Sequence, residues 1–287
     1  MTHCRSLLVS LVLLLCIVAH SSAQDVLSRA ELGFTVGGMN YIGDLNKQSM
    51  FGQVNLGAGL VGRYNLSDRW ALAFTASYGR LAGGNPDVDA LRNLSFRSDI
   101  WEGALRAEFN FVSFGFSGIS LHTTPFLFCG FGVFHFNPQA RYSNPLSGEQ
   151  SWVDLQPLHT EGQGLDAYPG RNPYPHFEVM FPFGFGFKMA LSKSVSLVLE
   201  YGFRKTWTDY IDDVSTTYVG EEALGYGSLA AALADRSGEV QSGYVNAVGI
   251  QRGDASLDDW YAYFNFSLAF NLNTLFGWMK SKTCDIK

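Results

Sequence analysis

The chain has 287 residues and a formal net charge of −6, and its 16% of charged residues hardly outnumber its 15% of Phe, Trp and Tyr. A water-soluble domain usually carries charge on roughly a quarter of its residues, and the absence of a basic run argues against nucleic acid as a partner. From Gln24 onwards no stretch approaches the roughly 18 apolar residues that a transmembrane helix needs.

The first 23 residues have the pattern of a secretory signal peptide. A basic residue precedes an unbroken apolar run over 7–19, and small residues lead up to Ala23. We therefore expect an exported protein, which excludes a cytoplasmic enzyme. Only Cys129 and Cys284 remain after cleavage, and two cysteines so far apart predict neither a disulfide framework nor a zinc site.

Strict alternation of large apolar and small or polar side chains predicts strands along most of the mature chain. Between 178 and 190, every odd position from Val179 to Met189 is large and apolar, and 195–207 and 260–272 repeat the pattern. Eight strands result, each long enough to cross a bilayer at a tilt, which takes about 9–11 residues. The five others are 30–42, 53–65, 69–82, 95–111 and 122–136.

The connections alternate in length. The links at 66–68, 112–121 and 191–193 are short, and those between them are long: 43–52, 83–94, 137–175 and 208–256. Short turns on one side and long loops on the other are typical of outer-membrane barrels. We therefore predict an all-β fold over 24–272, an eight-stranded antiparallel transmembrane barrel (OmpA/OmpX-like) with a periplasmic tail at 273–287. The alternative is a secreted β-sandwich, whose outer face would carry many more charges.

Charged residues on the minor face of these strands are predicted to point into the barrel. An eight-stranded barrel is filled by its own side chains, and an unpaired ion buried there costs several kcal/mol. An ion-paired plug is one interpretation, and a proton or ion path is the other. We expect Arg204 to be the least replaceable base, because Glu200 lies four residues before it on the same face and Glu102, Glu108 and Glu31 are expected to converge on it. The set comprises Glu31, Arg63, Glu102, Arg106, Glu108, Lys188, Glu200 and Arg204.

Residues that carry catalytic chemistry are sparse. The histidines of the mature chain have no metal-ligand spacing, and His135 is expected to point inward from its strand. The glycines alternate along strands and form no phosphate loop. We predict no catalytic site, no cofactor and no small-molecule substrate. Pro182 lies in mid-strand, where the missing N–H suggests a bulge.

Two of the long connections carry features of their own. Asp209, Asp212 and Asp213 lie close together in the last one; they suggest either a weak Ca²⁺ site or a solvated acidic rim that a partner contacts. Residues 221–235 are expected to form a short helix. Long loops are usually functional, so these should pack as a cap or bind a partner.

Several segments, most of them in the predicted loops, form a recognisable set. They are 41–46 (YIGDLN), 91–100 (LRNLSFRSDI), 136–138 (FNP), 155–164 (LQPLHTEGQG), 200–206 (EYGFRKT), 208–215 (TDYIDDVS), 234–237 (ADRS) and 251–253 (QRG). Through them the chain resembles the PorG family, outer-membrane barrel components of the type IX secretion system of Bacteroidetes. The similarity extends from about Glu31 to Leu272. Many outer-membrane barrels end on an aromatic residue, whereas here a tail follows Phe270.

The resemblance implies a non-enzymatic part of a protein secretion machine, which also supports gliding in some members. Its implied role is to anchor a periplasmic ring of PorK-like and PorN-like proteins to the outer membrane, with membrane lipids as its surroundings. Other interpretations stay open: a generic outer-membrane barrel with porin-like or adhesive function, or a lipid-modifying barrel enzyme. Eight strands leave no useful pore, which weakens the porin.

Candidate partner-binding residues lie on both sides of the predicted barrel. On the periplasmic tail, Phe276 and Trp278 are followed by Lys280 and Lys282, a combination of aromatic anchor and positive charge that suits an interface. The same aromatics would also suit the membrane-interface girdle. The candidates on the loops are Trp152, Glu161 and Tyr210.

Overall fold

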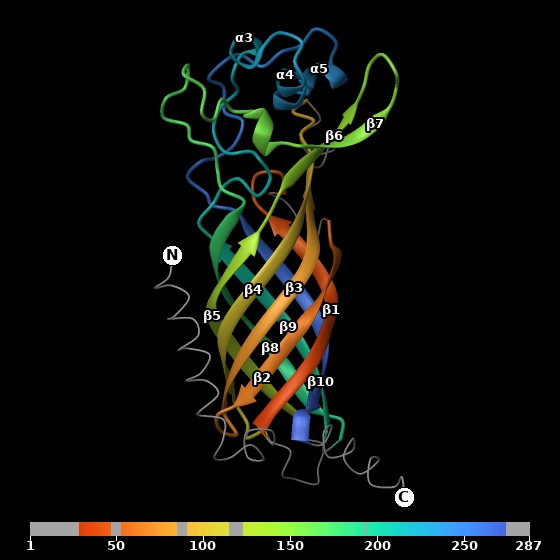
Figure 1. Cartoon of the computed structure of the whole chain (residues 1–287), viewed down its shortest axis with the longest axis vertical. Coiled ribbons are helices and arrows are strands. Elements are labelled where there is room, and N and C mark those ends of the chain that lie inside the picture. The colour runs from red at the N-terminus through yellow and green to blue at the C-terminus, as the bar shows by residue number, and fades with distance from the viewer. Residues whose placement is uncertain (1–28, 47–52, 85–90, 115–122, 193, 274–287) are drawn as a thin grey trace, which may run out of the picture.

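The computed structural model describes residues 29–46, 53–84, 91–114, 123–192 and 194–273. They form an elongated barrel with loops and short helices gathered at one end (Figure 1). Within this described part, no helix is both long and apolar enough to cross a membrane. The predicted signal peptide and the tail candidates Phe276, Trp278, Lys280 and Lys282 lie outside the described residues.

Eight antiparallel strands close the barrel, which confirms the predicted fold class. Each pairs with its neighbour along the wall, and the first pairs with the last, from Glu31 opposite Asn271 to Ile42 opposite Trp260. The strands begin and end within two residues of the predicted runs. They are β1 Ala30–Ile42, β2 Asn55–Asn65, β3 Trp70–Gly83, β4 Phe96–Asn110, β5 Thr123–His135, β8 Phe177–Ala190, β9 Val195–Thr206 and β10 Trp260–Asn271.

The two faces of the wall differ as the alternation predicts. On β1, the outward Phe34 is 63% exposed and the inward Thr35 is 7% exposed, because successive side chains of a strand point to opposite faces. Large apolar side chains stay exposed all around the barrel, as on a surface that meets lipid rather than water. Examples are Val36, Leu60, Phe74, Leu105, Phe131, Phe187 and Phe266.

Two short turns at one end of the barrel share one hydrogen-bond pattern. The N–H groups of Leu66 and Ser67 donate to the carbonyl of Trp70, at 2.9 and 3.1 Å. The N–H groups of Leu191 and Ser192 donate to the carbonyl of Val195 at the same distances. We call this the turn end. The first residue of β1 and the last residue of β10 both lie at this end.

The opposite end carries more structure than predicted. We call the described residues of the four long connections (43–46, 53–54, 84, 91–95, 136–176 and 207–259) the loop cap. Its third connection, predicted as a loop, contains a hairpin that extends the barrel wall, because β6 pairs with β4. The single helix predicted over 221–235 is replaced by short ones. The elements are β6 Pro138–Ser143, β7 Gln150–Asp154, η1 Gln156–Leu158, α3 Glu221–Leu224, α4 Leu229–Ala234 and α5 Ser237–Val240.

The predicted bulge at Pro182 is wrong. The β5–β8 ladder is interrupted between the pairs Cys129–Phe183 and Gly132–Met180, and it resumes in the same register. On its other side, Pro182 pairs with Arg204 in an unbroken ladder. A proline has no N–H to donate, so the strand loses ladder pairs here without gaining an extra residue.

Candidate functional site

The eight charged side chains assigned to the barrel interior all lie there, each at most 5% exposed. At the turn end, Arg63 lies between two carboxylates, 2.8 Å from Glu31 and 2.7 Å from Glu108. Glu108 also pairs with Lys188 at 2.7 Å and with Arg106 at 3.2 Å. One carboxylate therefore contacts three cations from three strands, which cross-links the wall from within.

The next level of the interior contains Arg106 and Arg204, and Glu102 is the one of the expected acids that pairs with Arg204. Both terminal nitrogens of Arg106 bind Glu200, at 2.7 and 2.6 Å. Arg204 forms its ion pair with Glu102 at 3.0 Å instead of with Glu200. Glu200 and Arg204 share a strand face, but the barrel brings a closer partner across the interior to each of them. Tyr261 donates a further hydrogen bond to Glu102, at 2.8 Å.

An aromatic cluster fills the barrel between these ions and the loop cap. Phe134 and Phe136 stack at 5.5 Å between ring centroids, and Tyr174 continues the stack at 6.0 Å from Phe136. Tyr210 stacks on the outer side of Tyr174, with the ring centroids 4.7 Å apart and the ring planes inclined by 12°. Met39 and Ile100 belong to the same buried cluster. The stack joins the barrel interior to the base of the loop cap.

Two buried carboxyl groups meet at one phenol at the base of the loop cap. The Tyr41 hydroxyl lies 2.6 Å from Asp212 Oδ2 and 2.7 Å from Asp259 Oδ1. The other oxygen of each carboxyl accepts a backbone N–H, from Val214 for Asp212 and from Ile211 for Asp259. A phenol has one proton to donate, so its hydroxyl bonds both carboxyl groups fully only when one of them is protonated and donates to the phenol oxygen.

A second buried network holds the long connections together around Arg252. Its guanidinium binds the Glu161 carboxylate at 2.9 Å and donates to the carbonyls of Asp213 and Ala234. Glu161 also accepts the N–H groups of Ser215 and Thr216, both at 2.9 Å. Each of these groups is partnered, as burial of charge requires.

The first two long connections join the same network. Asp44 accepts the backbone N–H of Asp254, and Arg92 donates to the carbonyl of Arg252. Gly253 allows the approach, because a Cβ there would lie 2.5 Å from the backbone nitrogen of Ser215. The loop motifs that carry the family resemblance therefore converge in space, although they are far apart in sequence.

The aspartates predicted to form a Ca²⁺ site or a solvated rim are buried. Asp213 accepts hydrogen bonds from Thr160 and Tyr174. Neither oxygen of Asp209 meets hydrogen-bond geometry, although Ser215 is close enough to lower its pKa somewhat. The solvated rim is therefore wrong. Among the described residues, no group of three or more His, Cys, Asp or Glu side chains is arranged to hold a metal ion.

Burial raises the pKa of every carboxyl in this acidic group, because it penalises the charged form. The pKa of Asp209 rises to about 8 and that of Asp212 to about 7. The pKa of Asp213 rises only to about 6, because the positive charge of Arg252 partly offsets the effect of burial. Asp259 is also raised, by burial and then by the neighbouring Asp212. Asp209, Asp212 and Asp213 therefore change charge near neutral pH.

The predicted partner-binding residues of the loops differ in accessibility. Glu161 is fully buried and its carboxylate is used inside the cap, so no partner reaches it in this structure. Tyr210 is half-buried against Tyr174. Trp152, on β7, is 43% exposed, and the Arg97 guanidinium lies 3.8 Å from the centroid of its ring.

His135 does not point into the barrel as expected. Its cross-strand partner Trp101 is exposed on the outer face, and its ring packs edge-on against Phe177 at 4.8 Å. The inward position at this level belongs to Phe134. No histidine of β5 is thus available to interior chemistry.

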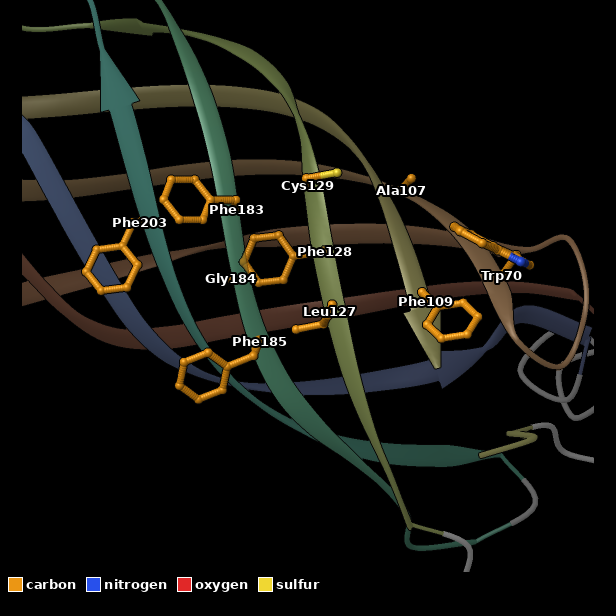
Figure 2. A pocket seen from close by; sticks show the side chains of 10 residues that line it. All are labelled: Trp70, Ala107, Phe109, Leu127, Phe128, Cys129, Phe183, Gly184, Phe185 and Phe203. Carbon is orange, nitrogen blue, oxygen red and sulfur yellow. The ribbon is translucent and has the colours of Figure 1, made fainter. Parts of the chain in front are cut away.

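The outer face carries an apolar groove of about 440 Å³ towards the turn end (Figure 2). Phe183, Phe185 and Leu127 line it, and Gly184 exposes the edge of the inward Phe128 between β5 and β8. Cys129 lies at its margin and is exposed. An apolar groove on an apolar outer face is suited to hydrocarbon chains.

Fold and site together define a closed antiparallel eight-stranded barrel with an apolar outer surface, an ion-paired interior and a loop cap held by buried carboxyl groups. A family model described as a domain of unknown function, DUF6089, matches residues 6–150. The match covers half of the chain, and the chain belongs to this family. No curated protein matches it.

Several solved structures are similar at low sequence identity. Neisserial surface protein A is 9% identical with a TM-score of 0.40, over 85% of this chain and 97% of that one. Ail, the attachment invasion locus protein of Yersinia pestis, is 9% identical with a TM-score of 0.39, over 84% and 96%. The outer membrane protein OprG of Pseudomonas aeruginosa is 13% identical with a TM-score of 0.37, over 85% and 97%.

Proposed function

We propose that this protein is an integral barrel of the cell outer membrane. The outward side chains of the wall support this, since residues such as Phe34, Phe74 and Phe131 are more than half exposed in an otherwise well-packed barrel. The barrel also pairs the backbone groups that no water would satisfy within a bilayer. In this orientation the turn end faces the periplasm and the loop cap faces outward.

Within that membrane, we assign the protein a structural, non-enzymatic role in the type IX secretion machine, as the anchor of its periplasmic ring. The observation that carries this proposal is the convergence on Arg252. Five of the segments by which the chain resembles the PorG family meet in one buried network: 91–100, 155–164, 208–215, 234–237 and 251–253. Such a network restricts which residues the loops can carry, whereas formation of the barrel alone does not restrict them. A shared set of loop motifs therefore indicates a shared cap architecture.

The interior supports a role without transport or catalysis. Four acids and four bases, among them Arg63, Arg106 and Glu108, are ion-paired and buried there, and aromatic rings fill the space above them. A barrel filled in this way serves as a rigid body in the membrane. Ring proteins of the PorK and PorN type would contact the short turns and the tail after Asn273.

Three measurements test the proposal in order. Membrane fractionation and gel mobility with and without boiling test the barrel, since a folded barrel should migrate differently before boiling. Deletion of the gene should abolish secretion of proteins with the C-terminal sorting domain. Crosslinking in intact cells, read by mass spectrometry, should link the turns or tail to ring proteins. A deletion strain that secretes normally would remove the secretion role and leave the barrel assignment standing.

A further inference from the structure

On the outer face of β3 and β4, a cross-strand pair of aromatic residues is followed directly by a charged pair. Tyr78 and Trp101 lie opposite each other with ring centroids 4.5 Å apart. The next outward pair towards the loop cap is Arg80 with Asp99, joined by an ion pair at 2.6 Å. Aromatic girdles mark the border between hydrocarbon and headgroups in membrane barrels. The charged pair therefore lies at headgroup level.

The β6–β7 hairpin carries this outer face beyond the border. Arg97 pairs with Gln139 across the β4–β6 ladder, and Arg141 pairs with Trp152 across the β6–β7 ladder. Side chains of paired residues project from the same face of a sheet, as do residues two apart on one strand. Arg97, Gln139, Arg141 and Trp152 thus continue the surface that faces lipid lower down.

Two guanidinium groups on this surface have no acidic partner. Arg97 donates to the side-chain oxygen of Gln139 at 3.0 Å and lies over the Trp152 ring. Arg141 donates to the side-chain oxygen of Gln150. Within the described ranges neither forms an ion pair, whereas Arg80 is neutralised by Asp99. The Asp154 carboxylate lies on the same face, where it pairs with Gln139 and accepts its side-chain N–H at 2.7 Å. The hairpin therefore presents two guanidinium groups and one carboxylate, an excess of one positive charge, around an indole that is 43% exposed.

We propose that Arg97, Arg141 and Trp152 form a binding surface for the phosphate groups of membrane lipid headgroups. Guanidinium groups bind phosphate through paired N–H donors, and Trp is enriched where hydrocarbon meets water. The ring and Gln139 hold the Arg97 side chain in place, so less side-chain entropy is lost on binding. Continuity with the lipid-facing wall selects a lipid over a soluble ligand. The inference rests on the proposed membrane location.

The test uses the full chain in detergent micelles, titrated with phosphatidic acid and followed by native mass spectrometry. The double variant Arg97→Gln/Arg141→Gln should bind the lipid about tenfold more weakly, because two cations near the headgroup are lost. The matched control, Lys205→Gln/Arg236→Gln, removes the same charge from residues already paired with Asp258 and Glu239 and should bind as the wild type does. Trp152→Leu, which keeps both charges, should also weaken binding.

Two competitors identify the source of the phosphate. Phosphatidylcholine should bind weakly, and inorganic phosphate at the concentration of the lipid should not displace phosphatidic acid. Equal binding by the wild type and the Arg97/Arg141 variant would overturn the proposal, and so would full displacement by inorganic phosphate or by an acidic peptide. Unboiled gel mobility, measured on the same samples, shows whether each variant is folded. Fractionation of cells tests the membrane location separately, so the two proposals fail independently.

Discussion

Asp212 and Asp259 approach the same phenol hydroxyl, that of Tyr41, from two different parts of the chain. Tyr41 belongs to the wall, Asp212 lies just beyond β9, and Asp259 directly precedes β10. The Tyr41 hydroxyl thus links the base of the last connection to the barrel.

The loop cap should be more stable in acid than in base. The pKa of Asp212 is about 7 in the folded chain, against 3.8 for an unperturbed group. The folded state therefore holds more protons between those values, and its stability falls as pH rises through that window. Asp213 and Asp209 shift in the same direction. Hydrogen exchange of residues 208–215 should be at least about tenfold slower at pH 5 than at pH 8. Equal rates, after correction for intrinsic exchange, would contradict the raised pKa values.

Substitutions at this cluster should separate its charge from its hydrogen bonds. Asp212→Asn keeps a polar partner for Tyr41 and removes one titrating group, so the pH dependence of cap exchange should flatten. Tyr41→Phe leaves two buried carboxyl groups without their common partner and should cost the cap roughly 1–3 kcal/mol. Exchange measured at several pH values on both variants checks this. An Asp212→Asn variant that keeps the wild-type pH profile would place the titration elsewhere.

Inside the barrel, Arg63 should be harder to replace than Arg204. Arg63 contacts Glu31 and Glu108, whereas Arg204 pairs with Glu102. Arg63→Ala leaves two carboxylates short of a partner, and loss of one partner of a buried ion pair costs about 3–5 kcal/mol. Urea unfolding in detergent, followed by gel mobility, should show a larger loss for Arg63→Ala than for Arg204→Ala. A larger loss for Arg204→Ala than for Arg63→Ala would instead support the prediction from the sequence that Arg204 is the least replaceable base.

Removal of Arg252 should open the loop cap and leave the barrel intact. Arg252→Ala deprives Glu161 of its ion partner and the carbonyls of Asp213 and Ala234 of a shared donor, with an expected cost of about 3–5 kcal/mol to the cap. Limited proteolysis should then cut within 207–259 while unboiled gel mobility stays unchanged. Arg80→Ala serves as control, because its pair with Asp99 is about two-fifths exposed and is worth roughly 1 kcal/mol or less.

Truncation after Asn273 tests the contact with the periplasmic ring. The removed segment contains Phe276, Trp278, Lys280 and Lys282. If the tail binds the ring, the shortened barrel should still insert but no longer co-purify ring proteins from detergent extracts. If co-purification persists, the tail serves the membrane interface, and the contact belongs to the turns.

The sequence predicts the wall well and the cap poorly, for a physical reason. Alternation of period two follows from an apolar outer face and a packed, polar interior, so it marks β1 to β5 and β8 to β10 directly. The β6–β7 hairpin is short and largely exposed, and no such pattern marks it. Pro182 removes a donor, but the alternation alone does not say whether the register changes.

The sequence does not predict the cap network, because its residues are of the types that usually lie at the surface. Asp212, Asp213 and Glu161 are charged and lie in a long loop, where solvation is the ordinary expectation. Only tertiary structure brings Arg252 and Tyr41 to them. Strand parity predicts which charged residues face the barrel interior. It does not predict which of them form ion pairs, because pairing depends on distances across the barrel. For that reason Arg204 pairs with Glu102 rather than with its near neighbour in sequence.

The pairing of β1 with β10 governs how this chain reaches its native state. Glu31 lies opposite Asn271, so the first strand obtains its second neighbour only after the last strand has been synthesised. Until then one edge of β1 is unpaired, and such an edge is a template for pairing with other chains. No shorter N-terminal piece can close, and loop closure over such a separation slows folding. The chain therefore depends on protection of this edge until its last strand is in place, and the stability of the closed barrel is gained in one late step.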